Sequence, residues 1–225
     1  GGVFSQINYG SRNSTILSSS YAYIEKYSCN STILAANYSY ISYGSEYATL
    51  ASAKDSSICY YNRYSSIIGG VNNKIKNNSC YSSIIGGKDN CINDSTYKST
   101  IIGGSGNTLN DGSRYSSIIG GIYNYVDDGR YSSIIGGENQ YAHGYYNVII
   151  GGKNNSLISN CSSIIDSDNG YIFYSSNATI ISSKNSDVVF DNNQSIIANN
   201  NSIIYSSYNS NIIGGRNNST YNSEY

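Results

Sequence analysis

The sequence contains no proline, methionine or tryptophan and only one histidine, and just 12% of its 225 residues are charged. A helical protein needs Ala, Leu, Glu, Lys and Arg in quantity, and a disordered chain is rich in proline and charge; this composition argues against both classes. Thirteen basic residues face fourteen acidic ones, whereas a nucleic-acid-binding domain carries a basic excess. No apolar run is long enough to span a membrane, and no secretory signal is recognisable. The missing methionine indicates a processed chain or an excised segment.

Gly, Tyr, Ser, Asn and Ile together account for 158 of the 225 residues, and they are arranged in a repeat. An apolar doublet within Ser-Ser-Ile-Ile-Gly-Gly or a close variant recurs every 15–18 residues. A second apolar column follows eight residues later, except that the unit of Thr49 is shifted to Ile58 and the last unit has Thr220. The doublets begin at Ile16, Ile33, Thr49, Ile67, Ile84, Ile101, Ile118, Ile134, Ile149, Ile164, Ile180, Ile196 and Ile212.

Two short β segments in each unit, joined by glycine and asparagine corners, predict an all-β fold: a parallel β-solenoid (β-roll or β-helix) with two strands per coil. We expect about 13 coils of 15–18 residues in a single domain over residues 1–225, without separate caps. The absence of proline fits, because each backbone N–H is needed by the adjacent coil. The corner glycines, which tolerate positive φ and close backbone approach, are Gly69, Gly70, Gly86, Gly87, Gly103 and Gly104. The expected core columns contain Ile67, Ile75, Ile84, Ile92, Ile101, Leu109, Ile118, Val126, Ile134, Ile149 and Leu157.

The pattern Ser-Ser-Ile-Ile-Gly-Gly-x-Asn-Asn-x-Ile, at 65–75, 82–92 and 99–109 with Leu109 closing the last, resembles the head repeats of trimeric autotransporter adhesins (YadA-like heads). Related repeats occur in other β-solenoid surface fibre proteins. The resemblance implies a left-handed parallel β-roll that assembles as a trimer and binds host or matrix surfaces.

The second residue of each doublet should point outward, because adjacent residues on a strand face opposite sides. The outward residues would then form an exposed apolar stripe along the rod, and large exposed apolar patches usually mark interfaces. The alternative is a kink that turns both residues of each doublet inward. We therefore expect copies of the chain to associate side by side. Chain ends without caps also suggest head-to-tail stacking into a filament. The expected oligomer seam contains Ile68, Ile85, Ile102, Ile119, Ile135 and Ile150.

Polar and aromatic columns precede each doublet. Paired serines stand directly before it, and tyrosines stand just upstream, where stacking at coil spacing would form a ladder with wet hydroxyl tips. This ladder could contact surface glycans, matrix or neighbouring rods; alternatively, tyrosine is there as a good β former. The tyrosines are Tyr64, Tyr81, Tyr115, Tyr131 and Tyr146.

Residues that could carry catalysis are sparse, so we predict no enzyme activity, catalytic residues, metal or cofactor. His143 is the one histidine and is expected in an exposed loop. The best carboxylate cluster, Asp166, Asp168, Asp187 and Asp191, sits at different offsets within its repeats. Of the five cysteines, Cys29 and Cys80 share an offset but lie three coils apart, too far for a disulfide. We expect unpaired thiols.

These features favour a non-enzymatic, extracellular structural protein at a cell or virion surface. It would be a rigid rod and a subunit of a fibre or filament, with surface adhesion as a task; its partners would be copies of itself and surface glycans or matrix, with no nucleic acid and no membrane insertion. An ice- or crystal-binding solenoid is the first alternative, because regular hydroxyl columns can match a lattice. A glycan-active β-helix enzyme is the second.

Overall fold

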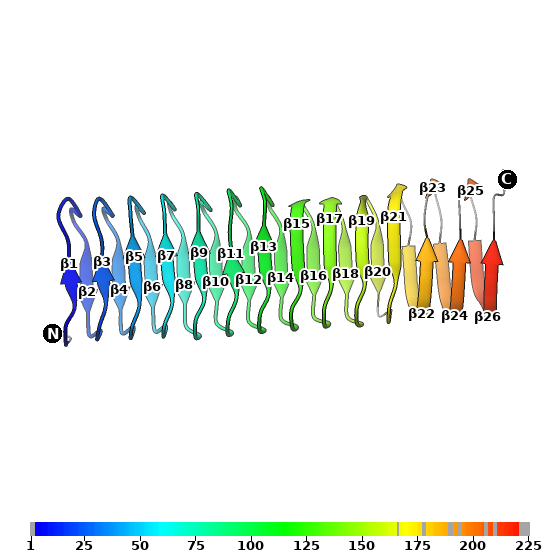
Figure 1. Cartoon of the computed structure of the whole chain (residues 1–225), viewed down its shortest axis with the longest axis horizontal. Coiled ribbons are helices and arrows are strands. Elements are labelled where there is room, and N and C mark those ends of the chain that lie inside the picture. The colour runs from blue at the N-terminus through cyan, green and yellow to red at the C-terminus, as the bar shows by residue number, and fades with distance from the viewer. Residues whose placement is uncertain are drawn as a thin grey trace.

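The computed structural model describes residues 3–165, 167–176, 179–188, 191–192, 195–204, 207–208 and 211–220. The chain winds into a rod in which strand follows strand along one axis, with the two termini at opposite ends (Figure 1). Every pairing between strands is parallel and joins a strand to one a coil further along, as in β2–β4 and β3–β5. The predicted all-β parallel β-solenoid with two strands per coil is thereby confirmed.

The described strands form two ladders, and three long strands near the C-terminal end, given below with the even-numbered ladder, take part in both. The even-numbered ladder contains β2 (Thr15–Leu17), β4 (Thr32–Leu34), β6 (Thr49–Ala51), β8 (Ser66–Ile68), β10 (Ser83–Ile85), β12 (Thr100–Ile102), β14 (Ser117–Ile119), β16 (Ser133–Ile135), β18 (Val148–Ile150), β20 (Ser163–Ile165), β22 (Thr179–Val188), β24 (Ser195–Ile204) and β26 (Asn211–Thr220). The odd-numbered ladder contains β1 (Gln6–Ile7), β3 (Tyr23–Ile24), β5 (Tyr40–Ser42), β7 (Ser57–Cys59), β9 (Lys74–Lys76), β11 (Cys91–Ile92), β13 (Thr108–Asn110), β15 (Tyr125–Arg130), β17 (Tyr141–Tyr145), β19 (Ser156–Asn160), β21 (Tyr171–Ser176), β23 (Asp191–Asn192) and β25 (Ser207–Tyr208).

The register of the third repeat corrects the sequence alignment. Leu50, not Thr49, pairs with Ile33 on one side and Ile67 on the other. Thr49 faces outward in the column of Thr32 and Ser66. With Leu50 as the core residue, Ile58 follows at the usual eight residues and pairs in register with Ile41. The apparent shift of this unit, and its 18-residue spacing, came from the wrong choice within an apolar pair.

Stacked core residues of the even ladder define the number of turns. Ten in-register positions from Ile16 to Ile164 enclose nine full turns, fewer than the thirteen predicted units. The remaining doublets, at Ile180, Ile196 and Ile212, lie on β22, β24 and β26, which pair in register with the ladder. The side chains of Ile180, Ile196 and Ile212 lie outside the described part of the chain.

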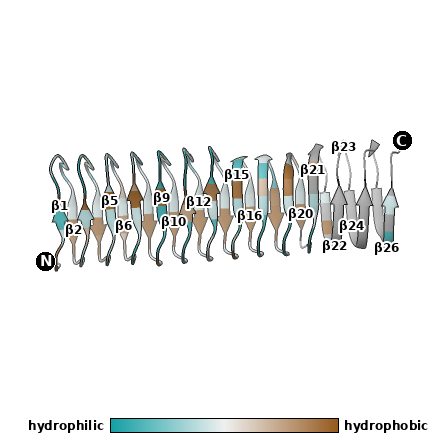
Figure 2. Cartoon of the chain, in the orientation of Figure 1, coloured by the Kyte–Doolittle hydropathy of each residue, from teal (hydrophilic) through white to brown (hydrophobic). Residues whose placement is uncertain are grey.

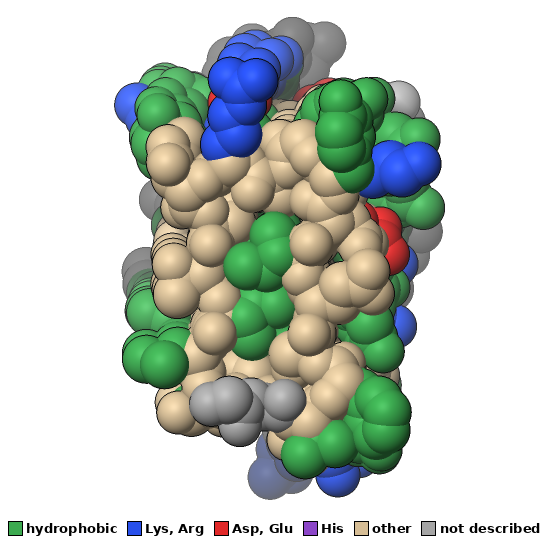
Figure 3. Space-filling model, turned by 90° about the vertical axis from the view of Figure 1, so that its left-hand side faces the viewer, with side chains coloured by type: hydrophobic (Ala, Val, Ile, Leu, Met, Phe, Trp, Pro, Cys, Tyr) green, Lys and Arg blue, Asp and Glu red, His purple; other side chains and the backbone are tan. Residues whose placement is uncertain are grey.

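Aliphatic side chains from both ladders fill the interior of the coil. Ile67 of β8 and Ile75 of β9 are fully buried, and so is every other predicted core residue. Hydrophobic residues gather in the strands, whereas many connecting turns are hydrophilic (Figure 2). An end-on view from the N-terminal end shows hydrophobic side chains at the centre of the cross-section, surrounded by backbone and polar side chains (Figure 3).

The two glycines of each corner have different roles. Gly86 and Gly87 both have positive φ, of 71° and 81°. A Cβ on Gly86 would meet nothing within 4 Å, and Ala35 takes the same corner position with a φ of 50°. A Cβ on Gly87 would lie 2.5 Å from the carbonyl oxygen of Gly104 and against the side-chain amide of Asn90. The first glycine relieves backbone strain alone, whereas the second also allows the next coil to approach.

Alanine substitution should separate these roles. We expect Gly86→Ala to lower the free energy of unfolding by about 1 kcal/mol, because an L-residue pays roughly that for a left-handed conformation. Gly87→Ala should cost about 2–4 kcal/mol, since overpacking adds roughly 1–3 kcal/mol to the same strain. Urea unfolding monitored by circular dichroism measures both, and equal losses would contradict this assignment.

Candidate functional site

An aliphatic stripe runs along the outer face of the even ladder. The structure places Ile67 inside the coil and Ile68 outside with 48% of its surface exposed, and this alternation repeats coil after coil. The alternative, a kink that turns both residues of the doublet inward, is wrong. The glycine corner begins only after Ile68, so Ile67 and Ile68 keep the alternation of an extended strand. The exposed stripe contains Leu17, Leu34, Ile68, Ile85, Ile102, Ile119, Ile135 and Ile150.

Only one serine of each pair reaches the surface. Ser66 of β8 is half-buried beside the stripe, but Ser65 is 1% exposed. The Oγ of Ser65 donates to the carbonyl of Ser79 at 2.8 Å and accepts from the N–H of Ser82 at 3.4 Å. The same link continues through Ser99, Ser116 and Ser132. The expected paired hydroxyl face is therefore a single outward row backed by an internal serine ladder.

A second internal ladder is made of side-chain amides. The Oδ1 of Asn107 accepts from the N–H of Asn124 at 3.0 Å, and its Nδ2 donates to the carbonyls of Gly120 and Gly121 at 3.2 and 3.3 Å. Buried backbone groups need such partners. The sequence signal is an Asn or Gln six residues after the core residue, as Asn73 follows Ile67; the residue before it, as in Asn72, takes a positive φ of 54°. The ladder contains Asn73, Asn90, Asn107, Asn124, Gln140 and Asn155.

The predicted tyrosines do form a stacked column on the outer surface. Ring centroids of Tyr64 and Tyr81 are 4.8 Å apart, and those of Tyr131 and Tyr146 are 5.0 Å apart with planes 4° from parallel. Tyr47, which the sequence analysis did not include, extends the column by stacking on Tyr64. All of these residues have φ between 53° and 57°. Bulky residues rarely adopt that conformation, and stacking worth about 0.5–1.5 kcal/mol per pair offsets part of the strain.

Lys98 interrupts the tyrosine column. This coil has lysine at the position where the neighbouring coils have tyrosine. The ring of Tyr97 lies edge-on to the rings of Tyr81 and Tyr115, with interplanar angles of 70° and 80°. The Lys98 ammonium lies 5.3 Å from the ring centre of Tyr97, 5.4 Å from Tyr115 and 6.0 Å from Tyr81. Cation–π attraction operates at these distances. The hydroxyls of Tyr115 and Tyr97 raise the pKa of Lys98 above its ordinary value, because their ionised forms favour the charged amine.

Stacking determines what the tyrosine column can contact. A sugar ring binds an aromatic residue through the flat face of the ring. In the column those faces are occupied by the neighbouring tyrosines, so mainly ring edges and hydroxyls are available. The tyrosine column therefore presents a row of phenol hydroxyls for hydrogen bonding, and not a series of free ring faces on which sugars could stack.

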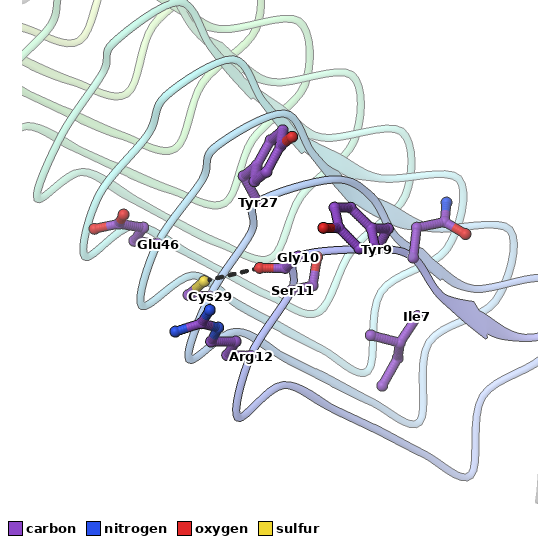
Figure 4. Close-up of a pocket in the computed structure, with 9 residues that line it drawn as sticks. Ile7, Tyr9, Gly10, Ser11, Arg12, Tyr27, Cys29 and Glu46 are labelled. Atoms are coloured by element: carbon purple, nitrogen blue, oxygen red, sulfur yellow. Dashed lines mark hydrogen bonds between the residues drawn. The ribbon is translucent and has the colours of Figure 1, made fainter.

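A shallow groove lies where the first turns meet, lined by Ile7, Asn8, Tyr9, Gly10, Ser11, Arg12, Tyr27, Cys29 and Glu46. Figure 4 shows the Tyr9 and Tyr27 rings at one part of the groove and the Arg12 guanidinium at another. The thiol of Cys29 donates to the carbonyl of Gly10 at 3.3 Å. The lining holds one carboxylate and no histidine, so it offers no pair of groups for general acid–base work.

The expectation that His143 lies in an exposed loop is wrong. His143 lies on β17, where it is half-buried. Its Nδ1 lies 3.8 Å from Oδ2 of Asp127 on β15 and has no hydrogen-bond partner among the described residues. Burial and the Asp127 carboxylate raise the pKa of Tyr141 on β17, and the same two causes raise that of Tyr125 on β15. These groups lie side by side on the outer face of the odd ladder.

The other candidate residues do not converge. Asp168 is exposed, Asp166 lies outside the described residues, and only the backbone of Asp187 and Asp191 is described. No three or more His, Cys, Asp and Glu residues in the described ranges are placed to hold a metal ion. Over the same ranges no helix is long and apolar enough to cross a membrane. The five cysteines, all within residues 3–165, are free thiols, with Cys59 buried and Cys161 exposed.

Comparison with known proteins adds no relative. No protein-family model matches this chain, and no curated protein matches it.

Removing one member of the amide ladder should destabilise the coil. Asn107→Ala leaves the buried N–H of Asn124 without a partner and removes one donor from each of the carbonyls of Gly120 and Gly121, which costs about 1–3 kcal/mol. The control is Asn110→Ala on the outer face, where Asn110 Nδ2 donates to Asp127 at 3.3 Å and water can replace it; its effect should stay within about 0.5 kcal/mol. Urea unfolding at neutral pH measures both.

An isosteric variant adds a pH signature to this test. Asn107→Asp cannot donate to the glycine carbonyls when ionised, and burial raises the pKa of the new carboxyl above its unfolded value of about 4. Stability should therefore be greatest below that pH and fall as pH rises. A free energy of unfolding that does not change with pH would show that water reaches the carboxyl at this position.

The carboxylate of Asp127 should control two tyrosines. We expect Asp127→Asn to lower the pKa of Tyr141 and Tyr125, because a nearby negative charge disfavours tyrosinate. The control is Asp128→Asn, since the adjacent carboxylate is not a cause of either shift. NMR titration of ¹³C-labelled tyrosine gives the values, and unchanged titration in Asp127→Asn would refute the assignment.

Proposed function

We propose that this chain is a non-enzymatic structural protein: a rigid rod that serves as a subunit of an extracellular fibre or filament at a cell or virion surface and takes part in surface adhesion. The observation that carries the proposal is the continuity of the stack. From Ile16 to Ile164 each coil lies in register on the previous one through the same columns. A uniform interior of this kind builds length and stiffness.

The interior polar ladders support this function. The side-chain amides of Asn90 and Asn107 add directional bonds to the aliphatic core, because each bonds to fixed backbone groups of the following coil. Loss of alignment would break several hydrogen bonds in every coil, each leaving a buried group that costs about 1–3 kcal/mol. The rod should therefore resist bending and local opening.

Negative-stain microscopy of the soluble chain tests the proposal. We expect straight rods, with nine turns at about 4.8 Å contributing roughly 43 Å of length. A thermal-hysteresis assay and a polysaccharide panel should both be negative. Flexible or globular particles would contradict the rod, strong thermal hysteresis would favour an ice-binding solenoid, and glycan cleavage would favour an enzyme.

A further inference from the structure

One face of the rod is almost free of charge. This flat face comprises the seven residues centred on each core residue of the even ladder from Ile16 to Ile149, which gives nine segments of seven, or 63 residues. Residues 13–152 contain 18 Lys, Arg, Asp and Glu residues, but only Lys98 belongs to the flat face. The segments are 13–19, 30–36, 47–53, 64–70, 81–87, 98–104, 115–121, 131–137 and 146–152.

Stacking does not explain this absence of charge. The odd ladder has the same parallel geometry, yet its outward positions include Lys74 and Lys76 of β9 and Asp127 of β15. Charged columns also border the flat face. Arg63 stacks with Glu46 on one side at 3.5 Å, and Lys153 with Glu138 on the other at 3.1 Å. Charged side chains are thus compatible with the coil on the odd ladder and at both borders of the flat face, which points to a separate cause for their absence from the flat face.

The outward side chains of the flat face form three parallel rows. The aliphatic stripe lies next to a row of Ser and Thr, and the tyrosine column follows beyond the internal serine ladder. Ser117 and Ser133 illustrate the hydroxyl row, with oxygens 3.1 Å apart. The cores of protein interfaces are enriched in aromatic residues and depleted of Lys, Glu and Asp, and a polar rim surrounds them. The flat face matches this composition in its tyrosines, its scarcity of Lys, Glu and Asp and its charged borders, and differs from it in the row of Ser and Thr.

We propose that the flat face packs against the flat face of a second copy of this chain. The inference deepens the proposed function, on which it rests, by naming the surface through which rods associate. A second copy repeats its rows at the same spacing of about 4.8 Å, so contacts made at one coil recur at every coil. A partner without this period could match only a few coils.

The size of the flat face suits such an interface. Nine turns give a length of about 43 Å, and seven extended residues span at most about 20 Å across. Their product is on the order of 800 Å², which is what each partner contributes to a standard interface. Burial removes almost no charge from water. The one ammonium, that of Lys98, keeps the rings of Tyr97, Tyr115 and Tyr81 as partners.

The test introduces charge on the flat face of the full chain. The double variant Ile102→Lys with Ile135→Lys should weaken self-association at least a hundredfold, because two ammoniums would be buried without partners. The control is Thr108→Lys with Ser156→Lys, at outward positions in the column that naturally contains Lys74. Sedimentation velocity and light scattering over a concentration series measure association, and circular dichroism verifies the fold.

Milder variants keep the test decisive if the lysine variant does not fold. Ile102→Ser with Ile135→Ser should weaken association by a smaller factor, and Lys98→Tyr should leave it unchanged or strengthen it. Wild-type rods that stay monomeric at every concentration would overturn this inference and leave the rod function standing. Equal association of the flat-face and control variants would overturn it too, as would binding of ice or a glycan to monomers through this face. Particles that are not rods would instead refute the proposed function.

Discussion

The structure depends on one constraint: each residue lies on its counterpart one coil away. The N–H of Gly86 donates to the carbonyl of Ile68 at 2.8 Å, and this link is repeated along the rod. A side chain must therefore be compatible with the side chain about 4.8 Å above and below it. Aliphatic groups, amides, hydroxyls and stacked phenols satisfy that condition, whereas like charges do not. Oppositely charged neighbours such as Glu138 and Lys153 satisfy it as well, whereas Arg114 and Arg130 form a stacked like-charged pair. The absence of proline follows from this constraint, because each backbone N–H is needed by the adjacent coil.

Inside the coil, shape and hydrogen bonding are adjusted together. Where the second corner residue is Gly87, the side chain three positions later is Asn90, whose amide occupies the space that a Cβ on Gly87 would need. Where the corner residue is Ala36, the corresponding side chain is the smaller Ser39, which bonds to the carbonyls of Asn37 and Ala53. Glycine and asparagine thus occur as a pair, and alanine and serine as another. A packed interior with few voids requires this kind of matching.

The repeat in the sequence was sufficient to predict the fold class, because a period near 16 with two apolar columns fits few architectures. It could not decide between adjacent residues of similar type. Thr49 and Leu50 both fit the doublet, and only pairing with Ile33 and Ile67 identifies Leu50 as the core residue. The same ambiguity hid the inward Ser65 and Asn73, since residue type does not reveal direction until the register is known. Tyr97 was missed for another reason: it lies one position outside the tyrosine column, yet its ring lies edge-on to Tyr81 and Tyr115 in the coil that has Lys98 in the column.

Regularity that stabilises the rod creates a difficulty for the proposed pairing of flat faces. The string Ser-Ser-Ile-Ile-Gly-Gly occurs at 65–70, 82–87, 116–121 and 132–137. Two copies packed through the flat face could slide past one another by a coil and meet almost the same contacts. A single distinctive polar residue can fix the register of an otherwise repetitive interface, as a buried asparagine does in coiled coils. Lys98, the one charge on the flat face, marks a single coil, and Tyr97 makes that coil different in shape as well. Alignments that place the ammonium against an aliphatic row cost desolvation energy, so the exception in the repeat is the feature able to align the rods.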